Sequence, residues 1–371
     1  MIRDIDTDAA AAHELFQSYG GMEGLPELAA PARARLDLQA IVRSVYPGLL
    51  VAITIGLAAD WLAGHYKAPV MLFALLFGMA FHFLHEDRGR CVAGIEFASK
   101  AVLRTGVALL GARITAQQIA ELGPVPIAMV VAGVTSTLLL GLLLSRLLGL
   151  SRAFGALSGG SVGVCGASAA LAIASVLPKT KESERDVILA VVVVTGLSTL
   201  AMILYPMLVT AIGLDHRHAG LFLGGTIHDV AQVVGAGYMI SPQTGDIATY
   251  VKLLRVAMLL PVVATIAFVI ANFDKQGGGA GAAGKARVPI PTFLFGFAAL
   301  VALNSLGVLP KPAVAAASDV SRWCLVVAIA ALGMKTSFKA LLEAGWRPLV
   351  AMVLETLWLA GLVLTAVETL T

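Results

Sequence analysis

Apolar runs close to the length of a bilayer span follow one another through most of this sequence. A helix needs about 20 residues to cross the hydrocarbon core, and about eleven segments approach that length. They cover residues 44–62, 68–85, 92–111, 124–146, 155–177, 187–213, 218–240, 248–272, 291–309, 320–334 and 347–367. Because backbone polar groups inside lipid must bond within their own segment, this pattern predicts an all-α polytopic membrane protein.

The composition supports this class of protein and excludes others. The chain is 58% hydrophobic and 13% charged, against roughly 25% charged residues in soluble domains. Its net charge of +3 arises from basic residues at segment ends, so it indicates no nucleic-acid surface. The three cysteines, Cys91, Cys165 and Cys324, are widely spaced, which indicates neither a disulfide framework nor a metal site.

The apolar segments divide the chain into four parts. Residues 1–40 are acidic and lack the apolar core of a signal peptide, so we expect a cytosolic tail. Residues 41–272 hold the first eight segments, residues 273–290 form a flexible glycine-rich linker, and residues 291–371 hold the last three.

The loop charges predict orientation. Most lysines and arginines fall on loops that share a face with the tail, which predicts a cytoplasmic N-terminus. The exception is the cluster Lys179, Lys181 and Arg185. It lies outside if segment 155–177 crosses the membrane, and inside if that segment is a re-entrant hairpin that turns near Cys165. The charges favour hairpins, although a full crossing stays open.

Two polar, glycine-containing stretches interrupt the apolar sequence. They are Gly159–Ser168 and Gly224–Gln232, and each predicts a broken helix that faces a cavity or a ligand. They also resemble each other, because six residues recur 65 positions later. Arg152, Gly155, Gly159, Gly160, Ser161 and Val162 match Arg217, Gly220, Gly224, Gly225, Thr226 and Ile227.

A second internal repeat has an offset of 222 residues. Ala108, Leu110, Gly111, Glu121, Gly123 and Pro126 match Ala330, Leu332, Gly333, Glu343, Gly345 and Pro348. Arg113 corresponds to Lys335, and the predicted topology puts these two loops on opposite faces. Inverted repeats of this kind bring two broken helices together near the bilayer midplane.

The polar side chains of the two stretches are candidate ligands for an anion. Backbone amides near Ser161 and Thr226, at expected helix N-termini, would bind its oxygens. Arg104 and Arg255 would add charge, whereas Lys100 and Lys252 are expected to snorkel to the interface. The alternative for the small hydroxyl residues is helix packing. The substrate-binding candidates are Gly160, Ser161, Cys165, Ser168, Thr226, Gln232, Arg104 and Arg255.

His228 and Asp229 are candidates for coupling transport to an ion gradient. They form a His-Asp pair inside an apolar run, and ionisable groups at this depth commonly mark ion or proton pathways. Histidine changes charge near neutral pH, which suits a proton carrier. The alternative is a structural cluster in which Asp229 caps a broken helix.

Four motifs resemble one family of transporters. They are Gly-Gly-Ser-x-Gly-x-Cys-Gly-x-Ser-Ala at 159–169, Thr-Ile-His-Asp-x-Ala-Gln-Val at 226–233, Lys-Leu-x-Arg at 252–255 and Leu-Leu-Gly-x-Arg at 109–113. Over residues 40–371 the chain resembles the YeiH family of proposed sulfate exporters. The resemblance implies the inverted-repeat fold of the cation/proton antiporter and anion transporter superfamily, in a bacterial inner membrane. It is weak support for any one substrate.

The leading hypothesis is a secondary transporter, and no enzyme, that exports sulfate or an organosulfonate by alternating access. Its partners would be the anion, a coupling proton or sodium ion, and membrane lipid; no cofactor is expected, and a homodimer stays open. An anion channel is the first alternative. An intramembrane hydrolase that uses Ser161 with His228 and Asp229 is a distant second, because adjacent residues project from a helix in different directions.

Overall fold

Helices account for every regular element in the part of the chain that the structure, a computed structural model, describes: residues 38–66, 68–86, 89–177, 181–276, 292–336 and 345–370. The helices are α2 (Leu38–Tyr66), α3 (Val70–Ala80), α4 (Phe83–Glu86), α5 (Val92–Phe97), α6 (Leu103–Leu110), α7 (Ala116–Glu121), α8 (Val125–Leu147), α9 (Arg152–Gly163), α10 (Ala167–Ala174), α11 (Lys181–Ala211), α12 (His216–Thr226), α13 (Val230–Ile240), α14 (Pro242–Ala257), α15 (Leu259–Gln276), α16 (Thr292–Ser305), α17 (Lys311–Lys335) and α19 (Trp346–Leu370). A π-helical turn, Ala98–Val102, joins α5 to α6. The predicted tail and most of the predicted linker lie outside the described residues.

The prediction of an all-α membrane protein is confirmed, but the number of membrane-spanning segments is not. Six helices of the described residues are long and apolar enough to cross a membrane. They are Val42–Tyr66, Val125–Leu147, Glu182–Ala211, Pro242–Val269, Lys311–Lys335 and Trp346–Thr369. Other predicted segments contain shorter helices, because glycines and polar residues interrupt them.

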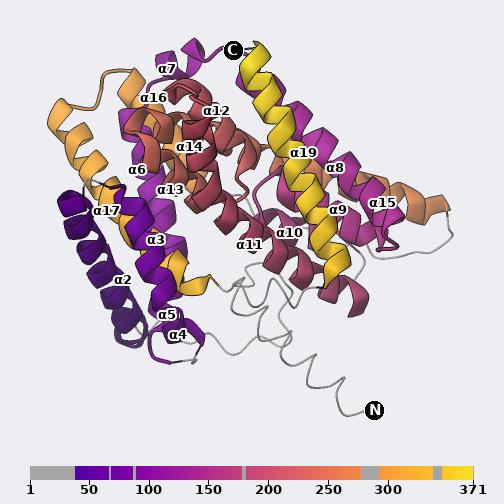
Figure 1. Cartoon of the computed structure of the whole chain (residues 1–371), viewed down its shortest axis with the longest axis horizontal. Coiled ribbons are helices and arrows are strands. Elements are labelled where there is room, and N and C mark those ends of the chain that lie inside the picture. The colour runs from indigo at the N-terminus through magenta and orange to yellow at the C-terminus, as the bar shows by residue number, and fades with distance from the viewer. Residues whose placement is uncertain are drawn as a thin grey trace.

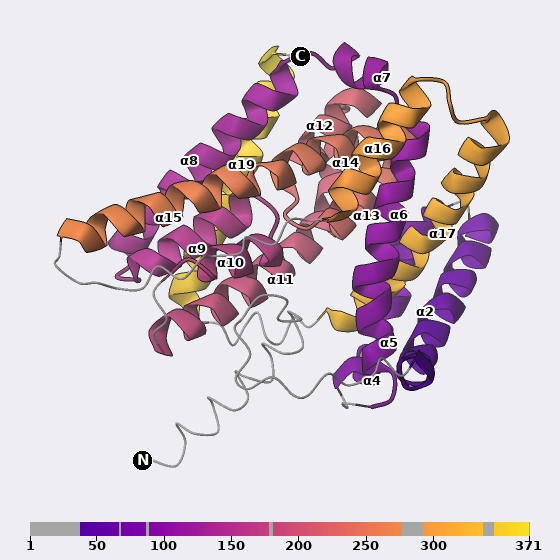
Figure 2. The ribbon, with the colours of Figure 1, turned by 180° about the vertical axis from the view of Figure 1, so that it is seen from behind.

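The helices form two bundles (Figure 1). The first bundle contains α2, α3, α5, α6, α16 and α17, and the second contains α8 to α14 with α19. Figure 2 shows α16 returning beside α6, after the chain has left the second bundle through α15. The bundles meet where α13 packs against α3 and α17. Helix α13 therefore belongs to one bundle and lies at the surface of the other.

Glycines allow the closest helix contacts. A Cβ atom on Gly78 of α3 would lie 2.2 Å from the carbonyl oxygen of Ala330 in α17. Between α8 and α9, a Cβ atom on Gly141 would lie 2.6 Å from the oxygen of Gly155. Inside a membrane, where lipid tails compete equally for apolar surface, such close backbone packing is a main source of helix association.

The first broken segment folds back on itself. Helix α9 ends at Gly163, Gly166 adopts a φ of +65°, and α10 begins at Ala167. Helix α10 packs along α9, since a Cβ atom on Gly160 would lie 2.1 Å from Cδ1 of Ile173. The Ser151 hydroxyl, which caps α9, donates to the Asp186 carboxylate near the start of α11 at 2.5 Å. The residue that precedes α9 thus lies beside the second turn of α11.

The second broken segment repeats this course. Helix α12 ends at Thr226, and α13 begins at Val230. The hydroxyl of Thr244, in the first turn of α14, donates to the carbonyl oxygen of His216 at the start of α12, at 3.1 Å. Helix α12 begins beside α7, where Arg217 approaches the Glu121 carbonyl, and it lies above α9, α10 and α11 in Figure 1.

A methyl group in a glycine contact tests this packing. We expect Gly78→Ala to lower the free energy of unfolding by about 1–3 kcal/mol, because the added Cβ overlaps a backbone oxygen of α17. Gly361→Ala in α19 is the matched control, since no atom lies within 4 Å of its Cβ position. Thermal unfolding in detergent measures both. Equal melting temperatures for the two variants would contradict the close contact.

Candidate functional site: the crossing of two broken helices

Two cations of α14 bind the ends of both broken helices, and we call this region the helix crossing. It comprises residues 164–166, residues 227–229, Lys252 and Arg255. The Arg255 guanidinium donates to four carbonyl oxygens: Nε to Gly163 at 2.9 Å, Nη2 to Val162 at 2.6 Å, and Nη1 to Gly224 at 3.3 Å and Ile227 at 2.9 Å. A single side chain therefore joins α9 to α12.

Lys252 lies one turn earlier on α14 and makes the same kind of contact. Its Nζ donates to the carbonyl oxygens of Val164 at 2.7 Å and Ile227 at 3.0 Å. Its side chain is fully buried, so the prediction that Lys252 snorkels to the interface is wrong. The physical reason is that two broken helices leave carbonyls without intrahelical donors, and this ammonium group supplies them.

The helix crossing holds more positive than negative side chains. The C-terminal ends of α9 and α12 carry partial negative charge, which favours cations there. Among the described residues neither Lys252 nor Arg255 forms an ion pair. Asp229 is the acidic group within electrostatic range of Lys252, and its carboxylate accepts instead from the Ala231 amide at 2.8 Å. With all three groups ionised, the site has a net positive charge.

Each cation has one N–H group beyond those that bond to carbonyl oxygens. A guanidinium has five N–H donors and an ammonium group has three. Four donor contacts to carbonyls are present for Arg255, and two for Lys252. One N–H group on each side chain therefore remains, and a small anion with several oxygens is a suitable acceptor for both.

The predicted anion ligands Ser161 and Thr226 lie at helix C-termini, which corrects the expected polarity. Helices α9 and α12 continue through their Gly-Gly-Ser and Gly-Gly-Thr sequences, so both residues occupy last turns. The Ser161 hydroxyl donates to the Leu157 carbonyl, and the Thr226 hydroxyl to the Phe222 carbonyl at 2.7 Å. These bonds within one helix also leave Ser161 unbonded to His228, so the geometry of the hydrolase alternative does not form.

The helix N-termini at the crossing belong instead to α10 and α13. The N-cap of α10 is Gly166, which supplies no side-chain acceptor, and the neighbouring Ser168 is exposed. The N-cap of α13 is Asp229, which is partly exposed. Cys165 is buried in the turn between α9 and α10, and Gly160 contacts Ile173. The accessible side of the crossing is thus the side with N-terminal amides.

The coupling candidates are anchored to neighbouring helices. His228 is fully buried, and its Nε2 lies 3.1 Å from the Thr356 hydroxyl of α19. The Asp229 amide donates to the Ser198 hydroxyl at 3.0 Å. The Gln232 side-chain amide donates to Thr199 at 2.8 Å, while its carbonyl oxygen has no partner among the described residues.

The remaining candidate, Arg104, does not join this site. It lies on α6 in the first bundle, and its side chain is exposed. Glu96, Lys100 and Arg104 recur at four-residue spacing in the sequence, but among these three only Glu96 and Lys100 form an ion pair, at 2.7 Å. The π-helical turn, Ala98–Val102, lies between Glu96 and Arg104 and changes the helical register.

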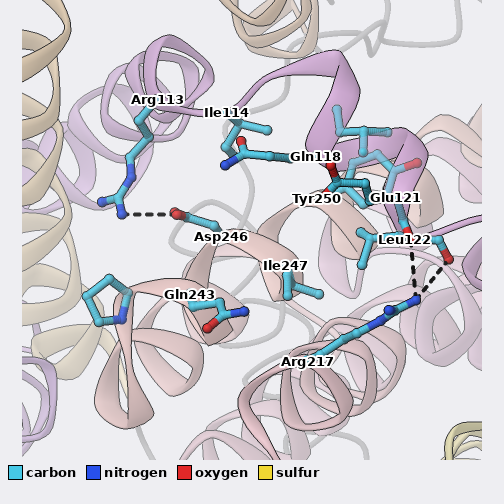
Figure 3. A pocket seen from close by; sticks show the side chains of 12 residues that line it. Arg113, Ile114, Gln118, Glu121, Leu122, Arg217, Gln243, Asp246, Ile247 and Tyr250 are labelled. Carbon is cyan, nitrogen blue, oxygen red and sulfur yellow. Dashed lines mark hydrogen bonds and ion pairs between the residues drawn. The ribbon is translucent and has the colours of Figure 1, made fainter. Parts of the chain in front are cut away.

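A cavity of about 560 Å³ lies beside the first turns of α14 (Figure 3). Arg113 and Asp246 form an ion pair of 3.0 Å at its wall, and Arg217 points toward the carbonyls of Glu121 and Leu122. Arg255 lies nine residues beyond Asp246 on α14, which is roughly 13 Å along a helix. The residues that line this cavity do not include those of the helix crossing.

Comparison with known proteins identifies the family. A family profile described as "Conserved hypothetical protein 698" matches residues 47–352. A UPF0324 membrane protein of Chlorobaculum tepidum is 57% identical over 322 residues, which is 87% of this chain and 89% of that protein. The chain belongs to this family. The predicted YeiH resemblance is thereby confirmed, because the UPF0324 family is the YeiH-like family.

Other UPF0324 relatives extend over nearly the same residues. UPF0324 membrane protein TauZ of Paracoccus pantotrophus is 51% identical over 320 residues, with 86% of this chain and 94% of that protein covered. A UPF0324 membrane protein of Rhizobium meliloti is 47% identical over 332 residues, covering 90% and 95%. These names describe membrane proteins, in agreement with the six helices of the described residues that are long and apolar enough to cross a membrane, and they name no substrate.

Sequence reasoning missed one buried acid and one half-buried ion pair of this UPF0324 protein. Glu355 in α19 is fully buried and accepts from the Ser158 hydroxyl of α9 at 2.7 Å. Lys335, at the end of α17, pairs with Glu96 at 2.7 Å. A signal for Glu355 exists in the sequence, since it is an isolated carboxylate inside the apolar run 347–367.

The capping role of Arg255 predicts a strict need for a guanidinium. We expect Arg255→Lys to lower the free energy of unfolding by about 1–3 kcal/mol, because an ammonium group has three N–H donors and cannot replace the four carbonyl contacts of the guanidinium group. Arg104→Lys, on the exposed face of α6, is the matched control. Thermal unfolding of purified protein in detergent compares them. A melting temperature of Arg255→Lys equal to that of the control would refute the cap.

Proposed function

We propose that this UPF0324 protein is a secondary transporter that exports a small oxyanion, either sulfate or an organosulfonate, across a bacterial inner membrane. The observation that carries the proposal is the pair of buried cations without ion-pair partners, Lys252 and Arg255, at the crossing of two broken helices. A buried excess of positive charge is costly unless a ligand balances it. An anion with several oxygens offsets the excess positive charge and accepts from the free N–H groups.

In this proposal the two broken segments are re-entrant hairpins that enter from opposite faces, as parts of an inverted repeat. The bonds from Ser151 to Asp186 and from Thr244 to His216 support the hairpins, because each bond joins the start of a segment to the helix after it. The arrangement also brings Arg185 to the face of Arg152, which satisfies the positive-inside pattern and gives a cytoplasmic N-terminus.

Alternating access would use the two bundles as its moving parts. Helix α13, which starts at the crossing, packs against α3 and α17 of the other bundle. A shift of one bundle against the other would expose the N-terminal amides of α10 and α13 to one face and then to the opposite face. His228 and Asp229 at the crossing are the proposed link to a proton or sodium gradient.

Uptake into proteoliposomes tests the transport function. We expect saturable uptake of at least one of labelled sulfate, sulfite, taurine and sulfoacetate, changed by an imposed proton or sodium gradient. Lys252→Gln should raise the apparent KM by roughly tenfold or more through loss of a buried charge. Lys311→Gln, at the exposed start of α17, is the control. Flux that does not saturate indicates a channel, and no flux of any anion contradicts the proposal.

Cysteine labelling tests the hairpins. In a background without Cys91, Cys165 and Cys324, we expect Arg185→Cys to react with an impermeant maleimide only from the cytoplasm. Gln243→Cys, at the exposed first turn of α14, should react only from outside, because α14 starts beside the other hairpin. Labelling of Arg185→Cys from outside in intact cells would exclude the hairpin and favour a full crossing.

A further inference from the structure

Glu355 is a buried acid that the helix crossing does not use. Its side chain has no exposed surface, and it lies in the middle of α19. Oε1 accepts from the Ser158 hydroxyl of α9 at 2.7 Å, whereas Oε2 is buried without a hydrogen-bond partner among the described residues. No described cation forms an ion pair with this carboxyl group.

A second unpartnered oxygen lies in the same layer. Gly133 of α8 faces Leu359 of α19, since a Cβ atom on Gly133 would lie 3.0 Å from Leu359 Cδ1. The helices run in opposite directions, so one turn onward along α8 and one turn back along α19 place Thr137 opposite Glu355. The Thr137 hydroxyl is also buried without a partner among the described residues.

The helices around Glu355 bring no charge to it. Helices α8, α9, α11 and α12 pack against α19. The acidic and basic residues of these four helices lie near helix ends, and they are Arg146, Arg152, Lys181, Glu182, Glu184, Arg185, Asp186, His216, Arg217 and His218. Ser158 is the side chain of these helices that hydrogen-bonds to the carboxyl group. The titratable group connected to this layer is His228, which contacts the adjacent Thr356.

A carboxylate in this position would be an isolated charge in a medium of low dielectric constant, which is strongly unfavourable. Uptake of a proton removes the charge and turns the unpartnered Oε2 into an O–H donor. The Thr137 oxygen forms no direct bond to Oε2, so a water molecule between the two would be the acceptor. The neutral acid removes the buried charge, while Oε1 still accepts from Ser158.

We propose that Glu355 is a proton-binding site of the transporter, coupled to movement of the broken helices. The inference rests on the proposed transport function. Glu355 and Thr356 are adjacent on α19 and contact Ser158 of the first broken segment and His228 of the second. A hydronium ion on one face would give its proton to the carboxylate and become water. When the helices move, the acid would return that proton to water on the opposite face.

Coupling of this kind is reciprocal. If protonation of Glu355 stabilises one arrangement of α9, that arrangement in turn binds the proton more tightly. Asp229 differs in this respect, because it caps α13 and is partly exposed. The two acids can thus be separated by experiment. Glu355→Gln removes a carboxyl group that has no capping role. Asp229→Asn also removes a carboxyl group, but the asparagine side-chain oxygen can still cap α13.

Infrared difference spectroscopy of the purified full-length protein detects the acid directly. Between high and low pH, we expect a carboxylic acid C=O band that shifts in D₂O and is missing in Glu355→Gln. Glu368→Gln, an exposed acid on the same helix, is the matched control and should keep the band. Ser158→Ala should move the band, since it removes the donor to Oε1.

Transport by the same variants gives the second readout. We expect Glu355→Gln to lower accumulation driven by a proton gradient by roughly tenfold or more, while exchange of the anion at equal pH persists. A band or a proton-driven accumulation that is unchanged in Glu355→Gln overturns the proposal, as does coupling to sodium without pH dependence. If Glu355→Gln does not fold, the band shift in Ser158→Ala decides, and no shift counts against Glu355. A wild-type protein that transports no anion refutes the proposed function, while the infrared band still tests the proton site.

Discussion

Carbonyl groups left by two interrupted helices are the constraint on which the centre of this protein depends. A helix that ends inside a bilayer leaves carbonyl oxygens that no water can reach, and each needs a donor from elsewhere in the chain. Arg255 and Lys252 supply those donors for α9 and α12 together. Because both cations come from α14, this helix fixes the two broken segments relative to each other.

The contacts of Arg255 and Lys252 with these carbonyls also determine which charged groups lie at the helix crossing. The carbonyl ends of α9 and α12 are buried, while the amide ends of α10 and α13 lie nearer the surface of the crossing. Cations hold the first pair of ends, and Asp229 occupies one of the second pair. The crossing thus holds two basic side chains and one acidic side chain, and each basic side chain has an N–H group beyond those that bond to carbonyls.

Polar groups elsewhere in the second bundle connect this centre to α19. Helix α19 is apolar along most of its length, yet Glu355 and Thr356 contact Ser158 of the first broken segment and His228 of the second. Burial of polar groups in lipid is energetically costly, so the polar residues that are retained there commonly have a function. A helix that touches both broken segments through adjacent residues is well placed to sense their positions.

The sequence by itself determined the class of protein, the position of the helices and the two breaks. Apolar runs and glycine-rich interruptions are local properties, and each predicted segment contains helix in the structure. Only the tertiary structure decided the polarity of the breaks, which places Ser161 and Thr226 on last turns instead of first turns. It also decided which basic residues are buried, since Lys252 is buried and Arg104 is exposed. The physical reason is that these contacts join residues far apart in the sequence. Arg255 bonds to the carbonyl oxygen of Gly163, 92 residues away, and sequence periodicity does not predict which distant carbonyl a basic side chain will contact.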